Sequence, residues 1–141
     1  MSDPTVADAQ VRHDLTTRSQ VHDPVLEFYR EVVMDELLEP VFSDVAEVDW
    51  TIHMPRLVDY WCGILLGATR SRVSTTAVHR RLHEQAPIRP EHCDRWYSMW
   101  TRCVRASWSG PHADLAVSHA ATLMAGMAKH VFGFAWKPPD D

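Results

Sequence analysis

Four side chains in this sequence could together meet a metal cofactor and its ligand. His53 and His79 can each bind a metal ion as a neutral imidazole. The hydroxyl of Tyr29 and the indole N–H of Trp96 are hydrogen-bond donors carried on rigid rings. A small helical domain with these groups is suited to a flat metal cofactor. One imidazole would ligate the metal from one side, and the polar aromatic side chains would face a diatomic ligand on the other.

The same residues also have simpler interpretations. His79 and His83 are four residues apart and would share one face of a helix, a spacing that could bind zinc. Their segment reads His-Arg-Arg-Leu-His, however, and lacks the glutamate of a metalloprotease helix. A histidine on a half-apolar helix is commonly exposed or hydrogen-bonded to protein. Tyr29 and Trp96 could in the same way be ordinary aromatic residues of a core.

The composition indicates one acidic globular domain. A chain of 141 residues fits a single domain that buries roughly 70% of its unfolded surface, which is enough to enclose a cofactor. The formal charge of −5 argues against nucleic acid as the main partner, because phosphate binding needs a basic face. The longest mostly apolar run, residues 60–68, is too short to span a membrane, and the first twenty residues lack the apolar block of a signal peptide. The three cysteines form no C-x-x-C pair, so we expect a reducing, cytoplasmic location.

The start of the folded domain is predicted at an acidic residue followed by proline. Asp23 would cap a helix whose first residue is Pro24. We therefore expect residues 1–22 to be a loosely ordered N-terminal extension, residues 23–136 to form the domain, and residues 137–141 to be a tail.

Helical periodicity and proline or glycine punctuation predict an all-α fold. A second helix is expected from about residue 50 to residue 66, with Pro55 in its first turn and Gly67 as its stop. A short helix carrying His79 and two longer helices, one starting at Pro90 and one after Gly110, complete the prediction.

Three segments resemble the truncated haemoglobins and follow one another in that family's order. Residues 28–42, Phe-Tyr-Arg-Glu-Val-Val-Met-Asp-Glu-Leu-Leu-Glu-Pro-Val-Phe, look like the family's second helix. Residues 50–61, Trp-Thr-Ile-His-Met-Pro-Arg-Leu-Val-Asp-Tyr-Trp, look like the distal helix of its third group. Residues 89–100 resemble that group's helix with the distal tryptophan, here Trp96. The resemblance covers about residues 24–132 and implies a shortened globin, a two-over-two helical sandwich.

The resemblance also implies a haem b cofactor and a proximal iron ligand. His79 stands at the proximal position. Many family members have a Tyr-Gly-x-Pro type segment before this histidine, whereas residues 69–74 read Thr-Arg-Ser-Arg-Val-Ser, so His83 is the alternative ligand. Covalent attachment is not expected, because the chain has no C-x-x-C-H motif.

On the distal side, the resemblance assigns three residues to the bound ligand. Tyr29 and Trp96 would donate hydrogen bonds to it, and His53 takes the distal-histidine position. The residues expected to bind the cofactor are Phe28, Trp50, His53, Leu57, Trp61, Leu65, His79, Arg80, Leu82, Trp96 and Met99.

The function implied is reversible binding of dioxygen, nitric oxide or another small ligand at an open distal site, for oxygen storage, transport, sensing or detoxification. The alternative is an enzyme, either a nitric oxide dioxygenase or a peroxidase-like haem protein. A dioxygenase that turns over continuously needs electrons, so we expect an unidentified reductase as a partner. A third interpretation, without haem, is a helical interaction protein that uses an aromatic face. Neither nucleic acid nor a membrane is expected as a partner.

Overall fold

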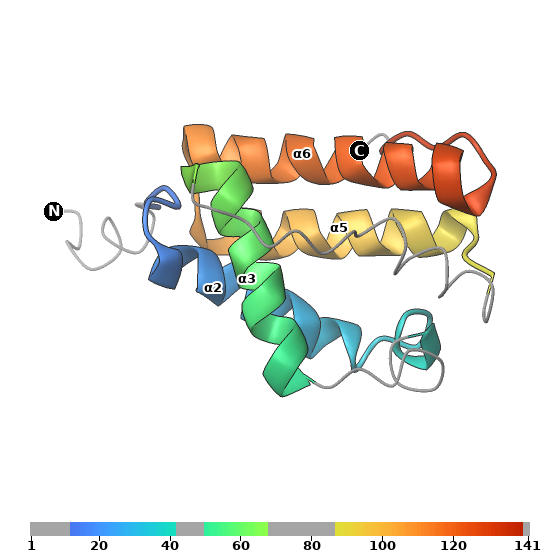
Figure 1. Cartoon of the computed structure of the whole chain (residues 1–141), viewed down its shortest axis with the longest axis horizontal. Coiled ribbons are helices and arrows are strands. Elements are labelled where there is room, and N and C mark those ends of the chain that lie inside the picture. The colour runs from blue at the N-terminus through green and yellow to red at the C-terminus, as the bar shows by residue number, and fades with distance from the viewer. Residues whose placement is uncertain (1–11, 42–49, 68–86, 140–141) are drawn as a thin grey trace, which may run out of the picture.

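The computed structural model describes residues 12–41, 50–67 and 87–139, and the regular structure of these ranges is helical (Figure 1). None of the described helices is long and apolar enough to cross a membrane. The main elements are the α-helices α2 (Arg18–Val32), α3 (Trp50–Leu66), α5 (Pro90–Ser107) and α6 (Pro111–Met127), and the π-helix η2 (Ala128–Phe132) that continues α6.

The four α-helices of the described ranges form two layers. Helices α5 and α6 lie side by side and are joined by a tight turn at Gly110 (Figure 1). Helix α2 packs against both α3 and α5, and α3 also packs against α6. The pair α2–α3 therefore lies over the pair α5–α6, which is the two-over-two arrangement that the resemblance to truncated haemoglobins implies.

The first described helix begins earlier than the sequence predicts. Helix α2 starts at Arg18, and Thr17 and Gln20 form a capping box. The amide of Gln20 donates to the Thr17 hydroxyl at 3.2 Å, and the Thr17 amide donates to the Gln20 side chain at 3.0 Å. The start predicted at Asp23 is wrong because this box satisfies the helix end upstream, and Pro24 lies buried inside the helix. The boundary expected at residue 22 falls within α2.

Helix α3 confirms both of its predicted ends, at Trp50 and Leu66. It stops at Leu66, and Gly67 follows with φ +71°, a left-handed conformation that glycine adopts without a steric penalty. Pro55 is the sixth residue of the helix, in the second turn, and the first-turn placement predicted for it is wrong.

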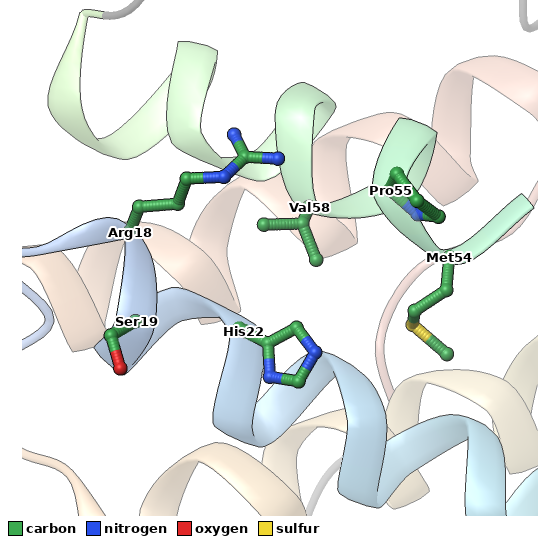
Figure 2. Close-up of a pocket in the computed structure, with 6 residues that line it drawn as sticks. All are labelled: Arg18, Ser19, His22, Met54, Pro55 and Val58. Carbon is green, nitrogen blue, oxygen red and sulfur yellow. The ribbon is translucent and has the colours of Figure 1, made fainter. Parts of the chain in front are cut away.

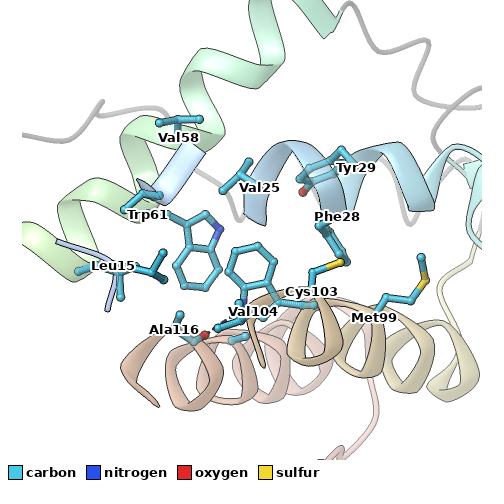
Figure 3. Packing of buried hydrophobic residues seen from close by; sticks show 14 of the residues in the cluster. Leu15, Val25, Phe28, Tyr29, Val58, Trp61, Met99, Cys103, Val104 and Ala116 are labelled. Atoms are coloured by element: carbon cyan, nitrogen blue, oxygen red, sulfur yellow. Dashed lines mark hydrogen bonds between the residues drawn. The ribbon is translucent and has the colours of Figure 1, made fainter. Parts of the chain in front are cut away.

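Aromatic residues fill the centre of the core. Phe28 of α2, Trp61 of α3 and Trp100 of α5 are each at most 3% exposed. Figure 3 shows Phe28 and Trp61 projecting from their helices into the same interior. The Trp100 indole N–H donates to the backbone carbonyl of Ala116 on α6 at 3.0 Å, so this buried polar atom is satisfied.

The segment before α2 is tied to the turn between α5 and α6. Leu15 is 1% exposed, and the amide of Ser109 donates to the carbonyl of His13 at 3.0 Å. The Asp14 carboxylate accepts from the backbone amides of His112 at 3.0 Å and Ala113 at 2.8 Å, in the first turn of α6. An acidic side chain from a distant segment thus caps the N-terminal end of α6, where the helix dipole favours negative charge.

Removing this cap is expected to destabilise the fold in a pH-dependent way. Burial alone would raise the pKa of Asp14. Hydrogen bonds from backbone amides and the charge of His112 lower this pKa by more than burial raises it, so the net shift is downward. Asp14→Ala should lower the free energy of unfolding at neutral pH by about 1–3 kcal/mol, measured by urea denaturation. Because the pKa of Asp14 is lower in the folded state, the cap contributes its full stability above the unfolded-state pKa of about 3.9. That contribution is lost as the pH falls through the folded-state pKa.

The difference between Asp14→Ala and the parent chain should therefore shrink as the solution is acidified below about pH 4. Asp23→Ala is the matched control, because the Asp23 side chain is 65% exposed on α2. Equal destabilisation by the two substitutions would contradict the capping role of Asp14.

Candidate distal pocket

Three helices bring the predicted distal residues together. Phe28 and Tyr29 are adjacent on α2, and their rings meet edge to face with centroids 4.8 Å apart. The Trp96 ring of α5 packs edge-on against Phe28, with centroids 5.6 Å apart. The His53 ring of α3 lies 6.2 Å from the Tyr29 ring, at 88° to it. Residues separated by up to 68 positions in the sequence thus share one place in the fold.

The two polar aromatic side chains are directly coupled. The Trp96 indole can only donate, so in its hydrogen bond with Tyr29 the phenolic oxygen is the acceptor. The hydroxyl of Tyr29 still carries its own proton, which it can donate to a second group. Burial raises the pKa of Tyr29 well above its usual value, and the bond from Trp96 offsets only part of that rise. Tyr29 therefore stays a neutral donor across the physiological pH range.

Helix α3 places His53 and Leu57 on a face that the protein covers only in part. The two residues are one turn apart and both half-buried. Val58 and Trp61, which point into the core, are 1% and 3% exposed. The half-covered face beside Tyr29 is where a flat apolar group could lie.

Some predicted lining residues lie deep in the protein core. Trp61 stacks on Trp100 with ring centroids 4.5 Å apart and an angle of 22° between the planes. Leu65 and Met99 are 5% and 3% exposed. Figure 3 places Trp61 on α3 and Met99 on α5, and Trp61 lies beside Leu15 and Val58, away from Tyr29.

Two further groupings carry chemistry that the sequence reasoning did not single out. Trp100 links α5 to α3 through its stack with Trp61. The sequence contains a signal for this residue, because Trp96 and Trp100 are four positions apart and so lie on one face of α5. Tyr60 on α3 and His119 on α6 share a hydrogen bond of 2.7 Å between the hydroxyl and Nε2. Nothing in the sequence pairs these two residues, which are 59 positions apart.

A second recess lies between α2 and α3, on a neighbouring face of α3. It encloses about 370 Å³. Figure 2 shows its apolar side formed by Met54, Pro55 and Val58 of α3, while Arg18 of α2 extends toward that helix. Arg18 is ion-paired with Asp59 at 2.6 Å. None of the residues that line this recess is a predicted distal residue, so it is separate from the cluster of Tyr29, His53 and Trp96.

The proximal half of the predicted site lies outside the described residues. This applies to His79 and its alternative His83, and to Arg80 and Leu82. For Trp50, the structure describes the backbone as the first residue of α3.

Comparison with known structures identifies this helical arrangement. The group III truncated haemoglobin from Campylobacter jejuni superimposes with a TM-score of 0.75, and the match covers 87% of this chain and 97% of the other. The chain has the truncated-globin fold. The two sequences are 16% identical, so the similarity is one of fold. No protein-family model matches the sequence, and no curated protein matches it significantly.

The comparison confirms the fold class that the three sequence segments imply. In the truncated-globin fold of this chain, α2, α3 and α5 are the helices that carry Tyr29, His53 and Trp96.

Proposed function

We propose that this chain is a haem b protein of the truncated haemoglobin type that binds dioxygen and other small diatomic ligands. One observation carries the proposal: in a truncated-globin fold, Trp96 and His53 come from two other helices and lie beside Tyr29. His79, which the resemblance places at the proximal position, would ligate the iron.

The chemistry of the pocket fits such a group. The half-covered face of α3 with Leu57 offers apolar contact to a flat ring, and the ring of Phe28 packs beneath the donor pair. The polar groups of the described pocket lie together, on the rings of Tyr29, His53 and Trp96. This arrangement provides one polar site in largely apolar surroundings. When bound, the haem would supply the iron and the open coordination position at which a diatomic ligand is held.

The protein's own contribution is to hold hydrogen-bond donors in place. Trp96 is fixed against Phe28, and its bond to Tyr29 fixes the phenolic oxygen in turn. Tyr29 is protonated at physiological pH, and burial raises its pKa further, so its O–H can donate to a partly negative ligand atom. A hydrogen bond to such an acceptor contributes about 1.5–3 kcal/mol. This hydrogen bond favours ligands that accumulate negative charge over less polar ligands.

We expect His53 to control access to the ligand site. It is the fourth residue of α3, and the amide groups of a helix's first turn have no intrahelical acceptor. Its ring lies edge-on to Tyr29 and is half-buried. A half-buried side chain in the first turn of a helix can swing more easily than one held between packed helices.

The decisive experiment is reconstitution with hemin. The purified chain should take up haem in equimolar amount and show a Soret band, and reduction should give a ferrous spectrum that changes on addition of carbon monoxide. Haem lost on mixing with acid acetone would confirm noncovalent attachment. A chain that remains colourless and does not titrate with hemin would refute the proposed function.

A further inference from the structure

We propose that a series of packed aromatic rings carries one-electron oxidising equivalents from the distal pocket to Tyr60, which gives its proton to His119. The ring contacts exist in the protein itself. The use of this route by a hydroperoxide at the distal pocket rests on the proposed haem site.

The route leaves the pocket through Phe28. The Phe28 ring packs edge-on against Trp96, with centroids 5.6 Å apart, and edge-on against Trp100, with centroids 5.5 Å apart. Phe28 is fully buried, and its ring packs directly against both indoles. Phenylalanine is much harder to oxidise than tryptophan. Phe28 is therefore a bridge, and the two indoles on either side of it are the groups that hold the charge.

The next step crosses from α5 to α3. Trp100 and Trp61 are stacked with centroids 4.5 Å apart, and they are 1% and 3% exposed. This is the closest ring pair described in the core, and its near-parallel faces give good electronic overlap. The Tyr60 ring follows, with its centroid 5.6 Å from that of Trp61.

The route ends where a proton can leave. The hydroxyl of Tyr60 and Nε2 of His119 are 2.7 Å apart, and both residues are only partly buried. A phenol is oxidised readily only if it loses its proton at the same time, and a neutral imidazole is the base for that purpose. One electron passes from Tyr60 to an oxidised Trp61, and the phenolic proton passes to His119. The products are a neutral tyrosyl radical, a neutral indole and an imidazolium ion.

The oxidant that such a route would serve is a hydroperoxide. Reduction of hydrogen peroxide to two water molecules consumes two electrons and two protons. Two passages along the route supply the electrons, and the two protons enter the pocket from solvent. Each passage leaves one proton on His119, which returns it to solvent. A small phenol or ascorbate-type donor in solution, which can reach the partly exposed Tyr60, restores the tyrosine after each passage.

The chain also contains two tyrosines that compete with this assignment. Tyr29 is hydrogen-bonded to Trp96 at the start of the route. Tyr97 packs against Trp136 with centroids 5.7 Å apart, away from the route. Every variant is therefore built on a Tyr97→Phe background, so that Tyr97 cannot form a tyrosyl radical. Any tyrosyl radical then arises at Tyr60 or at Tyr29.

The test is pulse radiolysis with azide radicals, which oxidise tryptophan in preference to the other side chains. It uses the purified Tyr97→Phe protein and requires no haem. We expect the absorption of the tryptophan radical to decay while that of a tyrosyl radical appears, at a rate independent of protein concentration. Adding Tyr60→Phe should remove the tyrosyl band. Adding Trp61→Phe, which keeps a ring in the stack, should also remove it, and His119→Gln should delay it.

Three outcomes would overturn the proposal. The tyrosyl band could persist in the Tyr60→Phe protein and disappear in Tyr29→Phe, which would place the radical in the distal pocket. It could be unaffected by Trp61→Phe, which would mean that the stack is packing only. It could be unaffected by His119→Gln, which would exclude that imidazole as the base.

A second readout links the route to the pocket. In the hemin-reconstituted Tyr97→Phe protein, freeze-quenched samples mixed with hydrogen peroxide should show a tyrosyl radical by electron paramagnetic resonance, and the Tyr60→Phe derivative should not. If radiolysis shows the transfer but the chain binds no hemin, the route stands and the proposed function fails. If hemin binds and neither experiment gives a radical at Tyr60, the haem proposal stands and the route is wrong.

Discussion

Replacing His79 with glycine is expected to abolish stable haem binding or to make it depend on added imidazole. If His79 is the proximal ligand, its removal takes away the bond between protein and iron and leaves only apolar contacts to the ring. Free imidazole can enter the space left by the side chain and restore a nitrogen ligand. The measurement is a hemin titration followed by the Soret band, with and without imidazole.

The matched control for this experiment is His83→Ala. His83 lies four residues further along the chain, the distance at which a shift of one helical turn would exchange the two histidines. The His83→Ala protein should bind hemin like the parent and give a five-coordinate ferrous spectrum. The opposite pattern, with haem lost in His83→Ala and kept in His79→Gly, would assign the iron to His83.

The second large effect is expected on dioxygen dissociation when either distal donor is removed. Tyr29→Phe deletes the hydroxyl and keeps the ring, and Trp96→Phe deletes the indole N–H. Tyr29→Phe should speed dioxygen dissociation by roughly tenfold or more, the equivalent of one hydrogen bond to a charged acceptor. Trp96→Phe should also speed it, because the Tyr29 oxygen then loses the hydrogen bond that holds it in place. Stopped-flow replacement of dioxygen by carbon monoxide in the reconstituted protein measures this rate.

The two donors should not act independently. Trp96 donates to the oxygen of Tyr29, so losing the indole also loosens the phenol. The double variant Tyr29→Phe with Trp96→Phe should therefore dissociate dioxygen at a rate different from the product of the two single effects. Strict additivity would mean that the hydrogen bond between the two side chains has no part in holding the ligand.

Two further variants separate the roles of the pocket residues. His53→Ala should change the association rate more than the dissociation rate, because His53 lies in the first turn of α3 and is only half-buried. Tyr97→Phe is the neutral control, since this tyrosine is next to Trp96 in sequence but packs against Trp136. If His53→Ala alone accelerated dissociation while both aromatic variants left it unchanged, His53 would be the main donor.

The sequence carried most of the information about the fold. The periodic apolar positions of α2 and the prolines and glycines near the other helix ends predict the four described α-helices in their observed order. These signals are local, because each depends on backbone geometry within a single helix or at its end. The error at the start of α2 has the same origin, because both the Asp-Pro pair at residues 23–24 and the upstream pair of Thr17 and Gln20 are local start signals, and the helix begins at the upstream one.

The position of Pro55 shows where local rules fail. A proline in the second turn removes one helical hydrogen bond, which an isolated helix would avoid. The packing of Val58, Trp61 and Leu65 against the other helices fixes α3 as a whole, and this burial outweighs the local cost. Such a balance depends on contacts with α2, α5 and α6 that the sequence does not display.

The candidate site was determined in two stages. The sequence by itself determined which side chains are available: their types, their spacing along each helix, and the resemblance that gave Tyr29, His53, Trp96 and His79 their expected roles. Only the tertiary structure decided which of them meet. It brought Tyr29, Trp96 and His53 together, placed Trp61 in a stack with Trp100, and paired Tyr60 with His119. The physical reason is that helical periodicity specifies a face, whereas the partner of that face depends on how the helices cross.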